Sequence, residues 1–552
     1  MKKIAYITII LLFAGCENLF HEDENTIQSI KSEDELISAL NAAYGWLAKT
    51  AEPIKSLIQL INADDINYES DNHVNLNFTF DTAGIYYTDN CNRGSMITHL
   101  YNYTGFNDYE TLNLTLWSEL YKSIACVNNI IVQYSEPDIE STDTKKLLGE
   151  AFFIRAYCYY RLVRIYGRIP LVNDIDVNYT LPRASFEEIY NFIENDLLKA
   201  IAYLPESNYQ ARIPYVTSHR GTAKAFLAEV YLTMGGFPLH DNEKYALAAR
   251  VAGEVIDSAH FYGFELLPDY ADLWKHNCLE TTFFSPRYYC PDTRFNAESV
   301  FASEADNNSS ISRYSTIGTS DTIFFPLLIF QGGIIPEVNF YNLFPESYRK
   351  EVTYTANMVI GFQLNKNFKY SPFIYHFNDI STCYVGMNFK KISYTEFDKD
   401  AEEFDDPLQA FIDNEYYISR GIRVQYLLRF AHTLLTFAEA KARSGQLDEF
   451  AYEAVNRIRR RANKVDLYSA SVYDLPTGLT AAQFADSVVQ ERAWEFACEN
   501  EGRWFDLLRL EKVDELPELR HPLEGGPPEY PITEDCYFAP IPDEDRWLNP
   551  NL

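Results

Sequence analysis

The stretch Leu147–Pro170, which reads LLGEAFFIRAYCYYRLVRIYGRIP, decides how this chain folds. Apolar residues recur in it at spacings of three and four positions, namely Leu147, Ala151, Ile154, Cys158, Leu162 and Ile165. That spacing puts them on one face of a helix, which we predict over residues 143–166. Gly167 is expected to end this helix, and Pro170 supports the stop because it cannot continue a helical ladder.

The same periodicity predicts further helices on both sides of this stretch. Their expected ranges are 33–49, 112–134, 185–203, 217–234 and 243–259 in the first half, and 424–444, 447–463 and 480–500 towards the end. Small residues at expected helix contacts, such as Ala225, Ala228 and Gly235, are typical of degenerate tetratricopeptide-type helix pairs. Each pair has an apolar face to bury, so we expect the late helices to pack back on the early ones in a mainly α fold.

Residues 262–420 differ from both helical blocks. Pro, Gly, Asn, Ser and aromatic residues dominate there, and helical periodicity fades. Such a composition indicates long loops with short strands and small helices, and loops of this length are usually functional. The predicted organisation is a helical block at 32–261, an irregular ligand-facing insertion at 262–420, and helices with a Pro-rich tail at 421–552.

The N-terminus has the pattern of an export signal. Lys2 and Lys3 precede the apolar run Ile4–Phe13, which is too short for a membrane-spanning helix of roughly 20 residues. Ala14-Gly15-Cys16 resembles a bacterial lipobox, although Phe13 stands where Leu is usual. We therefore predict a signal peptide at 1–15, lipidation of Cys16 and an acidic tether at 16–31; the alternative is an ordinary signal peptide with a chance cysteine.

Composition narrows the classes of ligand. The chain has 79 acidic against 47 basic residues, which disfavours nucleic acid as a partner. It also has 41 Tyr, 37 Phe and 6 Trp. A tyrosine offers a flat apolar face with a polar tip, which suits recognition of sugars or peptides, although ordinary packing must account for most of these residues.

Four stretches, in this order, carry a family resemblance. The first runs from Arg155-Ala156-Tyr157 through Tyr160–Val163 to Tyr166–Val172, the second is Tyr426–Ala431 with Leu434-Leu435 and Ala438-Glu439-Ala440, the third is Val455–Ala462, and the fourth is Glu491–Ala493 with Glu495-Phe496 and Gly502–Arg509. The tail adds Pro540-Ile541-Pro542 and Asn549-Pro550-Asn551. With these motifs behind a lipobox, the chain resembles the SusD/RagB family, surface lipoproteins of Bacteroidetes nutrient-uptake systems.

The resemblance implies an all-helical scaffold that contains tetratricopeptide repeats. It also implies an outer-membrane, cell-surface location through a lipid anchor, and a partner, a SusC-like TonB-dependent transporter, on which the lipoprotein sits as a lid. Family ligands are mostly oligosaccharides, with peptides in some members. The leading hypothesis is therefore glycan capture without catalysis; peptide capture, a surface hydrolase and a pure protein-interaction scaffold are the alternatives.

Aromatic and polar residues in two segments are the candidates for ligand contact. They are Tyr68, Asn72, Tyr86 and Tyr87 from the first segment, and Trp274, Arg287, Tyr288 and Tyr289 from the second. Flat aromatic faces can stack on sugar rings while a few aimed polar groups read hydroxyls. Trp274 is the best single candidate, and its alternative is burial at a helix end. Other tryptophans, at positions 46, 117, 494 and 504, lie in helical stripes or family motifs and are interpreted as core.

Several acidic residues could be taken for catalytic groups. Glu491, Glu495 and Glu499 share one helix face, and we favour ion pairing with arginines such as Arg492, Arg503 or Arg509 over a carboxylate cluster. Arg155 is expected to pair with a buried acid. For Asp64-Asp65 and Glu69 we favour hydrogen bonds to ligand hydroxyls or a helix cap over hydrolysis. The predicted protein is not an enzyme.

No cofactor is predicted. Asp174-Ile175-Asp176-Val177-Asn178 has the spacing of a calcium loop, but Tyr179 stands where glycine is required, which leaves a structural calcium ion only as an alternative. Among the cysteines, Cys126, Cys158 and Cys498 are expected to be buried thiols. Cys278 and Cys290 are close enough in sequence for a disulfide outside the cytoplasm.

Overall fold

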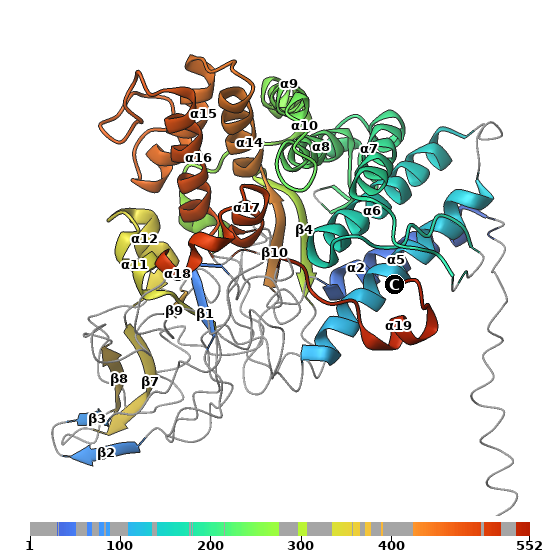
Figure 1. Ribbon diagram of the computed structural model, residues 1–552. Helices are drawn as coiled ribbons and strands as arrows, with labels where there is room; N and C mark the ends of the chain where they lie inside the picture. Colours follow the sequence, from blue (N-terminus) through green and yellow to red (C-terminus); the bar gives the residue numbers. More distant parts are fainter. Residues whose placement is uncertain are drawn as a thin grey trace, which may run out of the picture.

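The protein is described from a computed structural model, in which most helices gather on one side and the small strands on the other (Figure 1). The described residues are 30, 32–50, 63–68, 77–81, 84–88, 109–134, 141–175, 178, 180–214, 216–274, 296–305, 334–355, 357–364, 370–376, 388–389, 423–497, 499, 502–519 and 537–552.

Within the described residues, six long helices form the first block. They are α2 (Glu33–Thr50), α5 (Tyr109–Gln133), α6 (Thr142–Tyr166), α7 (Phe186–Tyr203), α8 (Arg220–Met234) and α9 (Glu243–Asp257). Each packs against the next in this order, which is the arrangement expected of successive helix pairs. All six were predicted from periodicity, and their bounds differ from the predicted ones by only a few residues.

Helix α6 lies at the centre of this block. Ser141 caps its start by accepting a hydrogen bond from the backbone of Thr144, and Gly167 ends it with a φ of 70°, as predicted. Every residue from Leu147 to Tyr166 is buried. The helix is therefore enclosed on all sides rather than along a single stripe, because α2, α5 and α7 pack around it.

Four helices form the second block: α14 (Phe430–Arg443), α15 (Glu449–Ala462), α16 (Ala481–Glu495) and α17 (Arg503–Arg509). Helix α14 packs against α8 and α9 as well as against α15 and α16. The prediction that the late helices pack back on the early ones is thus confirmed, and one continuous core contains residues from both blocks. None of the helices within the described ranges is long and apolar enough to cross a bilayer.

A two-stranded antiparallel ribbon runs between the blocks (Figure 1). It pairs β4 (Ser299–Ala305) with β10 (Arg423–Arg429), and β10 continues directly into α14. The predicted helix over 424–444 was therefore wrong for its first residues. The apolar run Tyr426-Leu427-Leu428 is compatible with a helix or with a strand. It forms a strand because it pairs with β4, which lies more than a hundred residues earlier in the chain.

The remaining strands form four small antiparallel pairs. They are β1 (Ile66–Tyr68) with β5 (Ile334–Pro336), β2 (Asn77–Asp81) with β3 (Gly84–Thr88), β6 (Tyr354–Thr355) with β9 (Asn388–Phe389), and β7 (Asn357–Leu364) with β8 (Tyr370–His376). The short helices are α10 (Ala259–Tyr262), α11 (Val338–Leu343), α12 (Tyr348–Thr353), α18 (Leu516–Leu519) and α19 (Asp543–Leu548), with 3₁₀ turns η2 (Asn208–Gln210), η3 (Tyr270–Leu273) and η6 (Val513–Glu515). Short strands and small helices were expected within 262–420, and the fold is mainly α; the limits of the three predicted parts stay a prediction.

The C-terminal tail returns to the first block. The backbone of Ala539 donates to the carbonyl of Ile165 at 2.7 Å. The side-chain amides of Asn549 and Asn551 donate to the carbonyls of Leu181 and Thr180, each at 2.8 Å. The tail therefore contacts the end of α6 through Ala539, and its motif Asn549-Pro550-Asn551 holds the segment that follows α6.

Candidate functional site

Two of the predicted ligand residues lie in one connected part of the molecule. Tyr68 ends β1, and its backbone pairs with Ile334 of β5. The segment that follows, which we call the β5–α12 segment (residues 334–355), contains α11 and α12. Helix α12 packs against η3, the turn that Trp274 caps. The structure therefore links Tyr68 and Trp274 through the β5–α12 segment.

Trp274 itself is only 4% exposed. Its ring meets Tyr270 and Tyr426 edge-on, with centroids 6.0 and 5.6 Å away, and the guanidinium of Arg429 lies 5.9 Å from it. With Val352 of α12, these rings form a small second core. The packing favours burial, the alternative weighed from the sequence, over an exposed platform; a contact between Trp274 and ligand stays a prediction.

The other predicted ligand residues divide into two groups. Tyr86 and Tyr87 lie on β3, where they pair with Thr79 and Phe78 of β2 in a hairpin that lies away from helices α6–α9 in Figure 1. The rest lie outside the described residues, namely Asn72, Arg287, Tyr288, Tyr289 and the predicted lipidation site Cys16. Cys278, Cys290 and Cys498 lie outside them too.

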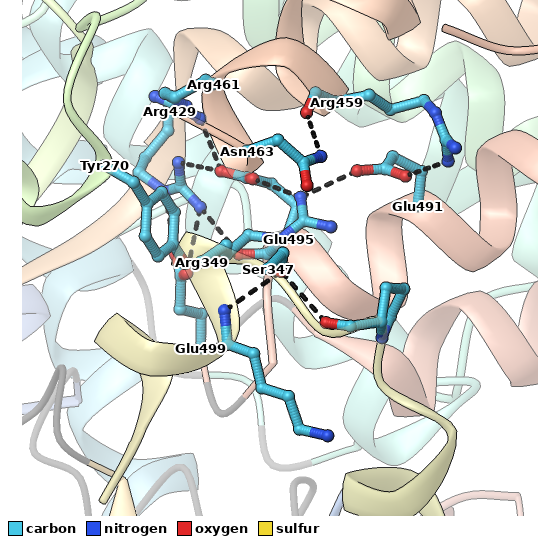
Figure 2. Close-up of polar contacts among 12 residues, drawn as sticks. Tyr270, Ser347, Arg349, Arg429, Arg459, Arg461, Asn463, Glu491, Glu495 and Glu499 are labelled. Carbon is cyan, nitrogen blue, oxygen red and sulfur yellow. Dashed lines mark hydrogen bonds and ion pairs between the residues drawn. The ribbon is translucent and has the colours of Figure 1, made fainter. Parts of the chain in front are cut away.

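The three glutamates that were predicted to share a helix face all meet arginines in the interior (Figure 2). Helix α16 ends at Glu495, however, so the predicted helix over 480–500 was too long and Glu499 lies beyond its end. Glu495 accepts hydrogen bonds from Arg349 at 2.9 Å, from Arg429 at 2.8 Å and from Arg461 at 2.6 Å. Four glutamates and four arginines take part in this arrangement, which we call the arginine–glutamate network: Glu298, Glu491, Glu495, Glu499, Arg349, Arg429, Arg459 and Arg461. Its formal charges balance.

Five elements meet in this network. Arg349 comes from α12 and forms ion pairs with Glu491 and Glu495 of α16. Arg459 and Arg461 come from α15, Arg429 from the end of β10, and Glu298 from the residue before β4. The network therefore joins the β5–α12 segment, the central ribbon and the second helical block at one buried point.

The ion pairs of this network favour the charged forms of Glu495 and Arg349. Burial alone would raise the pKa of Glu495, but Arg461, Arg429 and Arg349 outweigh it and lower that pKa to about 2. Burial also opposes the charge on Arg349, yet Glu491 and Glu495 raise its pKa. A carboxylate that stays ionised at neutral pH and is saturated by donors cannot deliver a proton to a substrate. The arrangement is a structural ion-pair network.

The preference for ion pairing over a carboxylate cluster is thus confirmed, but the predicted partners were wrong. Arg492 pairs with Asp506 and Glu229, and Arg509 pairs with Glu439 and Asp506. Arg492 follows Glu491 directly on α16, so its side chain leaves the helix about 100° away and enters a different cluster. Arg349, which sequence reasoning missed, lies in the part of the chain without a motif.

Asp64 also has a partner that the sequence did not suggest. Its carboxylate accepts from Arg503 of α17 at 2.8 and 3.3 Å, and both side chains are buried. The expectation that Asp64 binds ligand hydroxyls or caps a helix was therefore wrong. This ion pair attaches the residues before β1 to the second helical block, while Glu69 lies outside the described residues.

Arg155 behaves as predicted. It donates to both carboxylate oxygens of Asp196 on α7, at 2.7 and 2.8 Å, and to the amide oxygen of Asn128 on α5 at 2.9 Å. The buried charge of Arg155 on α6 is thus paired with a carboxylate of α7 and hydrogen-bonded to an amide of α5.

In the described part of the chain, Cys126 and Cys158 are free thiols. Burial raises the pKa of Cys158 to about 12, and Cys126 is half-buried with a raised pKa, so both are inert as free thiols. Among the described residues, no three His, Cys, Asp or Glu side chains gather as a metal site. Asp176 lies outside them, so a calcium ion at 174–178 stays an untested alternative.

Comparisons with known proteins agree with this architecture. A family model described as "Starch-binding associating with outer membrane" matches residues 50–232, and the model of the SusD family matches residues 284–552. SusD-like protein P2 of Formosa agariphila is 24% identical over 580 residues, which cover 100% of this chain and 98% of that protein.

Solved structures show the same fold. A SusD homolog from Bacteroides thetaiotaomicron superposes with a TM-score of 0.65 at 21% identity, covering 96% of this chain and 99% of that one. A laminarin-binding SusD-like protein superposes with a TM-score of 0.61 at 20% identity, covering 94% and 98%. Because the two family models together match most of the sequence and the fold agrees with both, this chain belongs to the SusD/RagB family.

Proposed function

We propose that this protein captures a glycan at the cell surface and delivers it, chemically unchanged, to a SusC-like TonB-dependent transporter. The observation that carries the proposal is the shared fold, over 94% of the chain, with a laminarin-binding SusD-like protein. The alternative is that the same scaffold binds a peptide, and it would be tested next if no glycan bound.

The state of the buried acids supports binding rather than hydrolysis. A glycoside hydrolase needs two carboxyl groups that flank the scissile bond, separated by roughly 5 or 6.5–9.5 Å and free to act on it. Asp64, Glu491, Glu495 and Glu499 are all buried and all paired with arginines. Each of these carboxylates is therefore committed to holding elements together.

The attachment of α12 supports a preformed site beside the β5–α12 segment. Ser347 caps the helix by accepting from the backbone of Lys350, and the hydroxyl of Tyr348 donates to Asp269 at 2.5 Å. Arg349 adds the buried pairs to Glu491 and Glu495. Because binding sites are mostly formed before the ligand arrives, we propose a site here to which the candidates Tyr68, Asn72, Arg287, Tyr288 and Tyr289 contribute, together with Tyr86 and Tyr87 of β3. Trp274, which is buried, supports this site through its packing.

The predicted tether supports delivery. If Cys16 carries the lipid, residues 16–31 can span at most about 58 Å when extended. That reach would let the folded body lie on a transporter or swing away from it while it remains anchored. A growth test addresses this step: deletion of the chain should abolish uptake of the glycan, and a Cys16→Ala version should restore it poorly.

Binding is tested on the soluble protein, truncated after Cys16, by affinity gel electrophoresis in a panel of polysaccharides that includes laminarin. Retardation of the wild type by one glycan is expected. Trp274→Ala and the double variant Tyr86→Ala/Tyr87→Ala should reduce it, whereas Tyr209→Ala, an exposed tyrosine on η2, should not. New reducing ends after incubation would contradict the absence of catalysis, and no retardation by any glycan would refute the proposal and direct the protein to a peptide library.

A further inference from the structure

An exposed aromatic arch lies between α15 and α16. Leu467 and Leu475 are buried in the main core and fix its two ends. Between them the chain runs through residues 468–474, which we call the 468–474 arch. Tyr468, Val472 and Tyr473 are 66%, 93% and 41% exposed. Apolar side chains are thus presented to solvent on a segment whose ends are firmly held.

Side chains of α15 form hydrogen bonds with the 468–474 arch. Arg460 donates to both carboxylate oxygens of Asp474, at 2.8 and 2.6 Å, and to the carbonyl of Leu467 at 2.8 Å. Arg459 donates to the carbonyl of Tyr473 at 2.7 Å. These bonds fix the backbone at the start and at the end of the arch.

Two further contacts complete the support. The side-chain oxygen of Asn456 accepts from the backbone of Leu475 at 2.8 Å. The hydrogen bond from Arg460 lowers the pKa of Asp474, so that this ion pair persists at neutral pH. A ligand that meets the arch therefore finds it already in one conformation, which reduces the entropy lost on binding.

The orientation of Tyr468 is also set. The guanidinium of Arg457 lies 5.0 Å from the centre of its ring, and the same group donates to its hydroxyl at 3.3 Å. A cation thus lies close to the ring, and most of the Tyr468 side chain is still exposed to solvent. Such a ring is an oriented flat surface with a hydrogen-bond donor, Arg457, beside it.

We propose that the 468–474 arch is a second carbohydrate contact surface, on which sugar rings of a long neutral polysaccharide stack against Tyr468 and Tyr473. The inference rests on the proposed function, because it assigns part of the same ligand to a new place. The apolar C–H face of a pyranose ring matches an exposed tyrosine, and the guanidinium of Arg457 can donate to a sugar hydroxyl.

The size of the arch favours a sugar over a protein. A stable protein interface takes about 20–30 residues from each side. The arch has seven residues, with three exposed side chains that matter for apolar contact. A single chain of sugar rings needs no larger surface than this.

The arch is also continuous with the proposed site. Lys464, just before it, lies 4.2 Å from the ring centre of Tyr348 on α12 and 3.5 Å from Asp269. Tyr468 is four positions after Lys464, which is at most about 14 Å of chain. Helix α15 packs against α12, and Figure 1 shows the two on the same side of the molecule. A polysaccharide held beside the β5–α12 segment can therefore extend to the arch.

The test compares chain lengths of one glycan. The double variant Tyr468→Ala/Tyr473→Ala is measured against the polysaccharide that retards the wild type, with laminarin tested first, and against hexasaccharides cut from the same polymer. We expect a dissociation constant about tenfold higher for the polysaccharide and a change under about twofold for the hexasaccharide. Tyr468→Phe/Tyr473→Phe keeps both rings and should bind as the wild type does.

The controls separate this inference from the function on which it rests. Tyr209→Ala removes an exposed tyrosine elsewhere and should leave both affinities unchanged. A double alanine variant that binds the polysaccharide like the wild type, or an equal loss in Tyr209→Ala, would overturn the role of the arch alone. A wild type that binds no polysaccharide would overturn the proposed function and this inference together.

Discussion

Arg349 on α12 lies 2.9 Å from the carboxylate of Glu495 on α16, a residue 146 positions further along the chain. Both side chains are almost fully buried. Through this pair the β5–α12 segment is attached to helices that carry family motifs, although the segment itself has none. The proposed glycan site would therefore be supported by a charge pair that links a segment without a recognised motif to helices that carry such motifs.

Replacing Arg349 tests that attachment. We expect Arg349→Met to lower the free energy of unfolding by about 3 kcal/mol, because Glu491 and Glu495 each lose a buried cation. Urea unfolding measures the loss, and hydrogen exchange should rise over residues 338–353 more than over α6. Arg250→Met is the matched control, since its pair with Glu254 is exposed and should be worth less than about 1 kcal/mol. A loss as small as that of the control would contradict the role given to Arg349.

Acid should weaken the fold through the same network. The pKa of Glu495 is about 2 in the folded chain, against 4.5 for an unperturbed glutamate. Because the folded value is the lower one, its contribution is present above pH 4.5 and is lost as the pH falls towards 2. The loss amounts to about 3 kcal/mol from this group, and Asp506, whose pKa is lowered in the same direction, adds to it. Unfolding free energies measured between pH 6 and 3 should decline; a flat profile in that range would show that these carboxylates are not held as described.

Gly236 offers a test of packing between the two helical blocks. A Cβ atom built there would lie 2.2 Å from the carbonyl oxygen of Arg509 in α17, so the two backbones touch. Gly236→Ala should therefore lower the free energy of unfolding by about 1–3 kcal/mol. Gly45→Ala, on α2 with nothing within 4 Å of the new atom, should instead stabilise by up to about 1 kcal/mol, because alanine favours a helix. A lower melting temperature for Gly236→Ala and a higher one for Gly45→Ala would confirm the contact. Equal shifts of the two melting temperatures would argue against it.

Local patterns were sufficient for some of these features and not for others. The caps of α6 and its apolar spacing lie within one stretch of chain, so its extent could be predicted. The start of α14 could not, because Tyr426-Leu427-Leu428 fits a strand or a helix and β4 decides between them. That Glu495 pairs with arginines followed from its place on a buried helix face. Arg349 is one of these arginines only because α12 lies against α16, and no local pattern in the sequence predicts that contact.

The candidate site illustrates the same limit. Residue type suggested Trp274, since an exposed tryptophan is a strong sugar platform, but burial depends on Tyr270, Tyr426 and Val352, which come from three separate elements. Tyr468 and Tyr473 were not among the predicted ligand residues, although both are exposed on the 468–474 arch. The sequence signal that could have found them is the pair of tyrosines within a short loop that follows an arginine-rich helix.

Trp274 separates a packing role from a binding role. Trp274→Ala should lower the free energy of unfolding by about 3–5 kcal/mol, because a buried ring leaves a cavity among Tyr270, Tyr426 and Val352. Trp274→Phe keeps an aromatic ring in the cluster and should cost less. If Trp274 acts only through packing, the Phe variant retains glycan affinity within about twofold, and the affinity of the Ala variant falls in step with its stability. If Trp274 touches the ligand, the Phe variant loses affinity while its melting temperature stays near that of the wild type. Affinity gels and thermal melts on the same two variants therefore decide between the interpretations, and the burial of this side chain leads us to expect the first.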